Sequence, residues 1–312
     1  MTNVSITLVS VLREPLPNLL RFITWHRRQG VSAFRFYFDD PADPAIAALV
    51  DVADVVCVPC TAAFWESLGL ATDERFTKRQ CAALTHGYRQ VTEGWVAVCD
   101  GDEFFHVEVG GLAPVLSGVA PEVAAVRFEP AEVIQTDAAD GMMRFRTPMP
   151  RKAIDRIYGA AGLLVRRNMG LVGHRQGKSI TRARQEVGAI RQHWAQDAAG
   201  NMLPEVVLDR TAGAYLLHFF DRGYESWRAK LAWRIGSWGF ASAIREHLAP
   251  LHLALQGGAD EAAEDTLRAE YRALHHFDAA KIADLDKIGC LYQLPETEFS
   301  KIDPDLAGLL GA

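Results

Sequence analysis

The sequence predicts an α/β fold in which a mainly parallel sheet is flanked by helices, with a helical addition at the C-terminal end. Three observations predict it. Short β-branched or aromatic runs alternate with segments whose apolar residues recur at helical spacing, which is typical of βαβ units. Polar residues gather where predicted strands end. From Tyr224 onward, helical patterns dominate, so we expect one catalytic domain over residues 1–223 and a helical region over 224–312.

The elements follow from local signals. Asp43-Pro44 is a typical N-cap and first helical residue, and Gly94 is a typical helix stop. Strands are expected over Ser5–Leu12, Ala33–Phe38, Val55–Val58, Trp95–Cys99, Ala124–Phe128, Met142–Arg146, Leu163–Arg167 and Tyr215–Phe220. Helices are expected from Pro17 toward Gly30, from Pro44 to Val52, from Thr72 or Asp73 toward Glu93, and over Glu225–Trp238, Leu248–Leu255, Asp260–His275 and Asp278–Leu285.

Charge is distributed unevenly along the chain. The net charge is −6, which argues against a general nucleic-acid binder. The segment from Arg144 to Arg191 nevertheless holds twelve Lys or Arg against two acids. A basic segment in an acidic protein is typical of an anionic ligand such as a diphosphate. The alternative is a solvated face whose acidic partners come from elsewhere in the chain.

Composition and the N-terminal sequence bear on location. Five scattered cysteines are typical of reduced core thiols, and Cys57 and Cys60 do not open a helix as a redox pair would. No apolar run is as long as a membrane span, and the N-terminus lacks a signal-peptide pattern. We therefore expect a cytoplasmic protein. The basic and Trp-containing segment around Trp233 leaves peripheral contact with the inner face of the membrane as an alternative.

The most informative stretch is WVAVCDGDEFFH, residues 95–106. An apolar strand ends abruptly in Asp100, Asp102 and Glu103. An unpaired buried carboxylate costs several kcal/mol, so such a cluster normally meets a metal, a cation or water. Asp-x-Asp with an intervening glycine suits Mn²⁺ or Mg²⁺, hard cations that take one or two carboxylates and complete their coordination with phosphate oxygens and water.

Two other predicted strands also end in polar residues. Arg13-Glu14 follows the first strand and Asp39-Asp40 follows the second. Because ligands of parallel α/β sheets bind beyond the carboxyl ends of the strands, these residues are expected to face the same crevice as Asp100. Capping or turn formation would explain any one of them. Lys178, Arg175 and Arg182 are candidate partners for a diphosphate, because cationic donors bind phosphate strongly.

Three segments resemble bacterial GT-A glycosyltransferases of the family 2-like group, which also resemble family 92 enzymes. The first is Arg13-Glu14 with the following LLRFITWHRRQGVSAFRFYFDD. The second is Gln80 with WVAVCDGDEFF, which is similar to the pattern Trp-Leu-Ala-Phe-Ile-Asp-x-Asp-Glu-Phe. The third is Gly177-Lys178-Ser179 with the later HFFDRGYESWRAK. The chain departs from the group in having Leu12-Arg13-Glu14 instead of Lys-Asn-Glu, and FDDPAD instead of Asp-Asn-x-Ser-x-Asp.

The resemblance implies a GT-A-type, Rossmann-like nucleotide-sugar fold with a DxD metal motif. Asp100 and Asp102 would bind the metal and the donor diphosphate, and His218 would be a further metal ligand from late in the chain. Asp39 would contact the base or ribose of the donor. Glu14, Gln80 and Lys178 complete the expected donor-binding set. On the residues alone, His218 is better explained as a core histidine than as a ligand, because apolar residues flank it on both sides.

An inverting transfer also needs a carboxylate that takes the proton of the acceptor hydroxyl. The candidates are Glu129, Glu132, Asp137 and Asp221, and Glu132 or Glu129 is preferred because both follow a strand expected near Asp100. Each is also explained as a turn or surface acid.

These observations predict a metal-dependent glycosyltransferase, expected to be inverting, that moves a sugar from a nucleotide-diphosphate sugar to a glycan, lipid or protein acceptor, as in polysaccharide biosynthesis. A metal-dependent phosphohydrolase acting on a nucleotide or sugar phosphate is one alternative, because the same carboxylates could activate water. A non-catalytic nucleotide-sugar-binding protein is another.

Overall fold

The computed structural model describes residues 4–220, 223–236, 240–257 and 261–300 of the chain. The chain divides into two compact units. The first comprises the residues up to Glu129, Gly177–Leu216 and those from Glu298 on, and the second comprises Pro130–Gln176 and Leu217–Thr297. The α/β class predicted from the sequence is confirmed, and so is the concentration of helices toward the C-terminal end.

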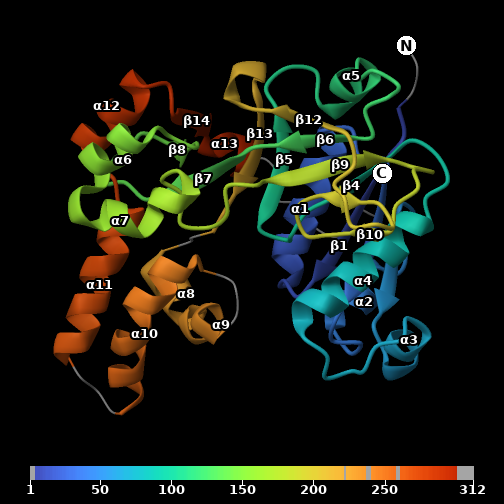
Figure 1. The fold of residues 1–312 in the computed structure, drawn as a ribbon, viewed down its shortest axis with the longest axis horizontal. Coiled ribbons are helices and arrows are strands. Elements are labelled where there is room, and N and C mark those ends of the chain that lie inside the picture. The colour runs from blue at the N-terminus through green and yellow to red at the C-terminus, as the bar shows by residue number, and fades with distance from the viewer. Residues whose placement is uncertain (1–3, 221–222, 237–239, 258–260, 301–312) are drawn as a thin grey trace. The chain divides into compact units, whose positions relative to one another are not determined.

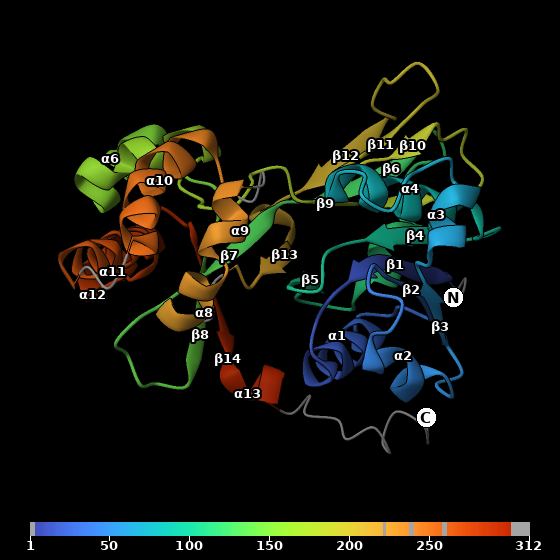
Figure 2. The same cartoon turned by 90° about the horizontal axis from the view of Figure 1, so that it is seen from below.

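The first unit is built on a seven-stranded sheet with strand order β12-β6-β9-β4-β1-β2-β3. Helices lie on both of its faces, with α1 and α2 on one and α3 and α4 on the other (Figure 2). The sheet and its helices comprise β1 (Ile6–Leu12), α1 (Leu16–Arg28), β2 (Ala33–Phe38), α2 (Pro44–Leu49), β3 (Val55–Pro59), α3 (Ala62–Ser67), α4 (Phe76–Arg89), β4 (Trp95–Val98), α5 (Leu112–Ser117), β6 (Ala125–Phe128), β9 (Lys178–Arg182) and β12 (Glu205–Leu208).

The prediction of a mainly parallel sheet is corrected by the structure, because the sheets are mixed. In the first unit β4, β1, β2 and β3 pair in parallel, and so do β12 and β6. Strand β9 runs antiparallel to both of its neighbours, β4 and β6. Strand β9 begins one residue after the chain returns to the first unit from the second, at Gly177.

Two smaller features of the first unit frame the acidic stretch. Strand β5 (Glu103–Val107) follows β4 directly after the turn at 100–102. A short hairpin of β10 (Ala189–Ile190) and β11 (Ala195–Gln196) lies against α4, where the Ile190 N–H donates to the Thr85 hydroxyl at 2.9 Å. The turn of this hairpin, residues 191–194, is closed by a backbone bond from Arg191 to Trp194.

The second unit combines antiparallel strands with most of the late helices. Strand β8 pairs with β7 on one side and with β14 on the other, antiparallel in both cases. Its elements are labelled in Figure 1, except α9, which is labelled in Figure 2: β7 (Pro130–Ile134), β8 (Met142–Arg146), α6 (Arg151–Tyr158), α7 (Gly162–Val165), α8 (Tyr224–Ala229), α9 (Leu231–Gly236), α10 (Ser242–Gln256), α11 (Glu261–His275), α12 (Ala279–Lys287) and β14 (Leu291–Pro295). Strand β13 (Ala214–His218) and helix α13 (Glu296–Ser300) contain the points where the chain passes between units.

Each unit has its own apolar core. In the first unit, buried residues of β1, β4 and α4 form a cluster around Val9, Tyr37 and Leu84. In the second, the helices pack around Trp227, which is 1% exposed, together with Tyr271 and Phe277. Trp227 is therefore a core residue, whereas Trp233 is 58% exposed. Among the described residues, no helix is long and apolar enough to cross a membrane.

Candidate active site

The sheet of the first unit brings three predicted site segments to one edge. Strands β1, β2 and β4 are adjacent and parallel, so their carboxyl ends, at Leu12, Phe38 and Val98, lie along the same edge. Glu14 follows the first of them, Asp39 the second, and Asp100 the third. The register pairs Leu12 with Phe38, so β1 and β2 end side by side, whereas Val98 at the end of β4 pairs with Val9, three residues before the end of β1. That the polar residues after these strands face one crevice stays a prediction.

Asp100 is held by two side chains of the same unit. Its Oδ1 accepts a hydrogen bond from Gln80 Nε2 at 2.8 Å, and its Oδ2 accepts one from Lys178 Nζ at 2.7 Å. Gln80 is itself buried and accepts a hydrogen bond from Gln192, in the turn of the β10–β11 hairpin. The Asp100 side chain nevertheless remains 36% exposed. The structure therefore brings Gln80, Asp100 and Lys178 together, as the resemblance implied.

Glu103 is buried beneath this turn. Its side chain is 1% exposed, its Oε2 accepts the backbone N–H of Asp100 at 2.9 Å, and Lys178 Nζ lies 3.3 Å from the same oxygen. Burial disfavours a charged lysine, but the carboxylates of Asp100 and Glu103 outweigh it and raise the pKa of Lys178. Lys178 thus stays protonated and acts as the counter-ion of the acidic turn.

Two close backbone approaches shape the site. A Cβ at Gly101 would lie 2.7 Å from Glu14 Cγ, so glycine lets the acidic turn lie against the β1–α1 connection. Gly177 has a φ of +66°, and a Cβ there would lie 1.8 Å from the Phe128 carbonyl. Glycine is thus required at the residue that places Lys178 at the start of β9.

Glu14 and Asp39 each have a partner in the first unit. Glu14 accepts a hydrogen bond from Asn18 at 2.9 Å and lines an open pocket of about 400 Å³ with Arg13 and Asp43. Asp39 Oδ2 accepts from Arg79 at 2.8 Å, whereas its buried Oδ1 has no hydrogen-bond partner among the described residues. Asp39 therefore has one buried acceptor that no described residue uses.

Of the two preferred bases, Glu129 has surroundings that suit proton transfer. It follows β6, whose last residue Phe128 pairs with Lys178 on β9. Burial raises the pKa of Glu129, with a further contribution from Asp209, while Arg210 and Arg127 oppose the shift. A carboxylate whose pKa is raised is a better proton acceptor.

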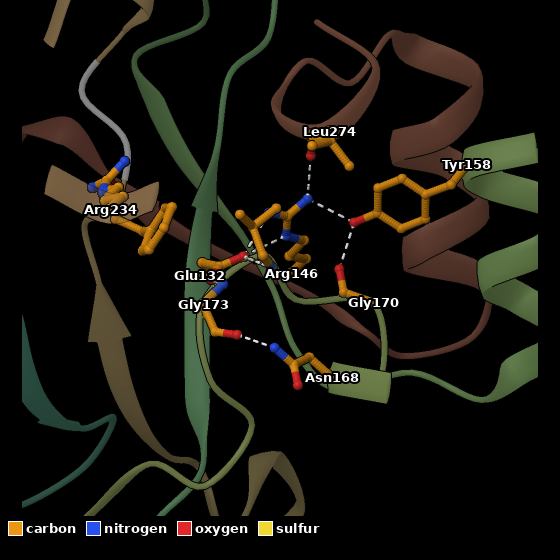
Figure 3. A network of polar contacts seen from close by, with 10 residues as sticks. Glu132, Arg146, Tyr158, Asn168, Gly170, Gly173, Arg234 and Leu274 are labelled. Atoms are coloured by element: carbon orange, nitrogen blue, oxygen red, sulfur yellow. Dashed lines mark hydrogen bonds and ion pairs between the residues drawn. The ribbon is translucent and has the colours of Figure 1, made fainter. Parts of the chain in front are cut away.

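Glu132 is engaged in an internal network of the second unit (Figure 3). It is 1% exposed and forms an ion pair with Arg146 at 2.5 Å. Its two oxygens also accept the backbone N–H groups of Val172 and Gly173, at 2.8 and 2.7 Å. Burial alone would raise the pKa of Glu132, but Arg146, His218 and the two N–H groups lower it below its ordinary value. These contacts suit a structural anion rather than a base.

Four further residues named from the sequence are His218, Asp102, Asp137 and Asp221. His218 is buried in the second unit, with its ring centroid 5.6 Å from that of His174, and its Nδ1 has no hydrogen-bond partner among the described residues. Its role as a metal ligand stays a prediction. Asp102, half-buried after Gly101, is placed by the chain beside Asp100. Asp137 contacts His276 in the second unit, and Asp221 lies outside the described residues.

Half of the twelve cations in the basic segment have the partners within the protein that are given below. Acids from inside and outside the segment meet five of its cations, in the pairs Arg144–Asp140, Arg146–Glu132, Arg156–Asp284, Arg166–Asp155 and Lys178–Asp100. Arg182 donates to the backbone carbonyls of Val119 and Val123 and lies over the Trp95 ring. These six cations are therefore structural rather than an anion-binding surface.

Sequence reasoning missed three contributors to the site. Arg79 pairs with Asp39, and Gln192 reaches Asp100 through Gln80. His193 Nδ1 donates to the Gly177 carbonyl at 2.9 Å, next to Lys178. None of these residues belongs to a recognisable motif. Arg79 could have been found by its position beside Gln80, but the short strands of the β10–β11 hairpin give almost no signal in the sequence.

Comparison with known proteins gives only distant similarities. No protein-family model matches the chain, and no curated protein matches it. Among solved structures, the mannosyltransferase PcManGT from Pyrobaculum calidifontis, in complex with GDP-Man and Mn²⁺, is 14% identical with a TM-score of 0.40, over 98% of this chain and 85% of that one. HddC from Yersinia pseudotuberculosis is 11% identical with a TM-score of 0.33, over 69% of this chain and 93% of that one. Similarities at this level do not assign the chain to a family.

Proposed function

We propose that the protein is a metal-dependent glycosyltransferase that moves a sugar from a nucleotide-diphosphate sugar to a hydroxyl group of a glycan, lipid or protein. The observation that carries the proposal is the edge of the sheet at which Glu14, Asp39 and Asp100 follow three adjacent parallel strands. This is where α/β sheets bind nucleotides. The proposal is also supported by the sequence resemblance to family 2-like enzymes, since Glu14, Asp39 and Asp100 belong to the first two of the segments that carry it.

The side chains of the acidic turn fit a divalent cation. Asp100 and Asp102 offer oxygen ligands of the kind that Mn²⁺ and Mg²⁺ prefer, and the Asp100 carboxylate is partly exposed. Each carboxylate oxygen has two lone pairs, so the bonds from Gln80 and Lys178 leave acceptor capacity on Asp100. A bound cation would neutralise charge on the diphosphate leaving group.

Donor recognition would involve the other two strand ends. Asp39 Oδ1, without a partner among the described residues, could accept a hydrogen bond from the base or ribose. The pocket beside Glu14 lies between the β1–α1 connection and the start of α2, where the Asp43 carboxylate caps the helix by accepting the Ala45 N–H.

Glu129 is the better candidate for the general base. It would take the proton of the acceptor hydroxyl as the hydroxyl oxygen forms a bond to the anomeric carbon and the bond from that carbon to the diphosphate oxygen breaks. A single displacement of this kind inverts the anomeric configuration. Glu132 is less suitable because Arg146 and two backbone N–H groups stabilise its charged form.

Nucleotide binding can be tested by thermal unfolding of the purified protein. A ligand that binds only the native state raises the melting temperature by mass action. We expect one nucleoside diphosphate among GDP, UDP, ADP and CDP to raise it by several degrees with Mn²⁺ present, and by clearly less with EDTA. The Asp102→Asn variant should lose this difference. No metal-dependent shift with any of the four would contradict the proposal.

A further inference from the structure

The charge balance of the acidic turn rests on a buried lysine. Asp100, Asp102 and Glu103 bring three carboxylates into four consecutive residues. Lys178 reaches them from β9, a strand 75 or more residues further along the chain, and its side chain is 1% exposed. With the lysine included, the turn carries two net negative charges, which are equal in magnitude and opposite in sign to the charge of one divalent cation.

Lys178 is buried too deeply for a cation from solvent to replace its ammonium group beside Asp100. Its Nζ lies 2.7 Å from Asp100 Oδ2 and 3.3 Å from Glu103 Oε2, and Glu103 is as deeply buried as the lysine. Removing the ammonium group would leave a buried carboxylate without its counter-ion, which is strongly unfavourable. The lysine therefore remains in place whether or not a divalent cation is bound.

We propose that Lys178 is a fixed counter-ion that keeps the intrinsic affinity of the acidic turn for divalent cations low, so that a cation binds tightly only together with the anionic diphosphate of the donor. The inference rests on the proposed function and deepens it. A positive charge at hydrogen-bond distance from Asp100 repels a cation that approaches the same carboxylate. The diphosphate supplies the extra negative charge that overcomes this repulsion.

The test is direct titration of Mn²⁺ by electron paramagnetic resonance in the absence of nucleotide. Lys178→Gln removes the charge but keeps a hydrogen-bond donor near Asp100. We expect this variant to bind Mn²⁺ at least tenfold more tightly than the wild-type protein, and the dependence of Mn²⁺ affinity on added nucleoside diphosphate to shrink. Adding Asp100→Asn to Lys178→Gln should cancel the gain. Unchanged or weaker Mn²⁺ binding by Lys178→Gln would overturn the proposal.

Lys78→Gln is the matched control. Lys78 lies on α4, two residues from Gln80, and its exposed side chain pairs with Glu74 at 2.6 Å. The Lys78→Gln substitution removes one positive charge from the same unit, so the Mn²⁺ affinity of this variant should differ from that of the wild-type protein by less than twofold. If Lys78→Gln changed the Mn²⁺ affinity as much as Lys178→Gln does, net charge alone would explain the tighter binding, and the proposal would be overturned.

The unaltered protein gives a second measurement, which decides the question even if Lys178→Gln does not fold. With ¹⁵N-labelled lysine, a buried and hydrogen-bonded ammonium group should give an Nζ signal protected from exchange with water. We expect it to persist, with a shifted frequency, when Mg²⁺ and a nucleoside diphosphate are added. Loss of protection on addition of Mg²⁺ would show that the cation displaces the lysine, and would overturn the proposal.

The results that would contradict the proposed function differ from those that would contradict the counter-ion proposal. If Lys178→Gln binds Mn²⁺ more tightly but the protein transfers no sugar, the counter-ion proposal is supported and the proposed glycosyltransferase function is contradicted. If the protein transfers sugar while Lys178→Gln leaves Mn²⁺ affinity unchanged, only the counter-ion is rejected.

Discussion

Single carboxylates in this chain have contrasting roles that only their neighbours reveal. Glu129 and Glu132 are three residues apart and look equivalent in the sequence. In the structure Glu132 is paired with Arg146, on the adjacent strand β8, and with the backbone at residues 172 and 173. Those partners are 14 to 41 residues away, so local sequence patterns carry no information about them. Glu129 has no ion pair among those found in the described residues, and burial raises its pKa.

The two glutamates can be separated by mutation. We expect Glu129→Gln to lower kcat by roughly 10²- to 10⁴-fold, the usual contribution of general base catalysis, with little change in melting temperature. In the wild-type protein, the proposed transferase activity should rise with pH as Glu129 loses its proton, with a midpoint above the ordinary carboxyl value of 4.5. Steady-state kinetics over a range of pH measures both.

Glu132→Ala is the contrasting variant. It would leave Arg146 as an unpaired buried cation and should lower the free energy of unfolding by about 3–5 kcal/mol. Denaturant unfolding measures this. If Glu132→Ala folds stably but is inactive while Glu129→Gln retains full kcat, the assignment of the base is wrong.

At the scale of elements, helix α1 holds the strand that follows the acidic turn. The Trp25 indole N–H donates to the Phe105 carbonyl at 2.7 Å, and the Phe105 N–H donates to His26 Nε2 at 3.2 Å. Two consecutive side chains of α1 thus satisfy the backbone of one residue of β5. His26 Nδ1 donates to the Phe22 carbonyl, so the ring is neutral with one donor and one acceptor.

This arrangement gives stability a pH dependence. Burial lowers the pKa of His26 from 6.5 to about 3, although its bond to the Phe22 carbonyl opposes the shift. Below pH 6.5 the unfolded chain binds a proton that the folded protein does not, so folding loses up to about 1.4 kcal/mol per pH unit from this residue. Burial also lowers the pKa of His106 and His275, which adds to the loss.

The contribution of His26 can be isolated by comparing denaturant unfolding at pH 7 and pH 4. His26→Gln retains an acceptor for the Phe105 N–H but cannot take up the proton, so its stability should fall less between the two pH values than that of the wild-type protein. His247→Gln, at an exposed histidine of α10, is the control and should follow the wild-type curve. Equal losses in all three proteins would refute the assignment to His26.

Elements with a strong local pattern could be predicted from the sequence, whereas elements fixed by distant contacts could not. The strands β1 to β4 and the Asp43-Pro44 start of α2 match the prediction closely. Helix α4 begins at Phe76, later than the predicted cap at Thr72 or Asp73. The predicted strand Leu163–Arg167 is wrong, because α7 and a 3₁₀ turn occupy it. A short apolar run fits either structure, and only packing decides between them.

Strand β9 shows the same limit more sharply. Its sequence, KSITR, has a cation at each end and lies in the basic segment, so nothing in it indicates a buried central strand. Lys178 and Thr181 are buried because their partners come from β4, its following turn and β6, up to 85 residues earlier. From the sequence, Lys178 is predicted to be a site residue, but in the role of a phosphate ligand. In the structure it is a partner of Asp100.

At the scale of the whole molecule, the compact units do not follow chain order. The division by contacts is discontinuous, because Pro130–Gln176 belongs to the second unit and Gly177–Leu216 returns to the first. The expected division into residues 1–223 and 224–312 is continuous and stays a prediction about function. Composition marks the change to helices near Tyr224. The passage of the chain from the first unit to the second at Pro130 has no linker-like composition that could be detected in the sequence.

The cellular location is also a property of the whole molecule. The cytoplasmic location and the contact with the membrane surface stay predictions, and the exposed Trp233 is the residue on which the membrane contact would depend.

The measurement that tests the central claim most directly is release of nucleoside diphosphate from a panel of nucleotide-sugars, with Mn²⁺ or with EDTA. We predict turnover of at least one donor that requires the metal and falls at least 10²-fold in Asp100→Asn and Asp102→Asn, while both variants keep the wild-type melting temperature to within a few degrees. Release of inorganic phosphate instead would indicate a phosphohydrolase. Turnover that persists in EDTA or in both variants would contradict the account.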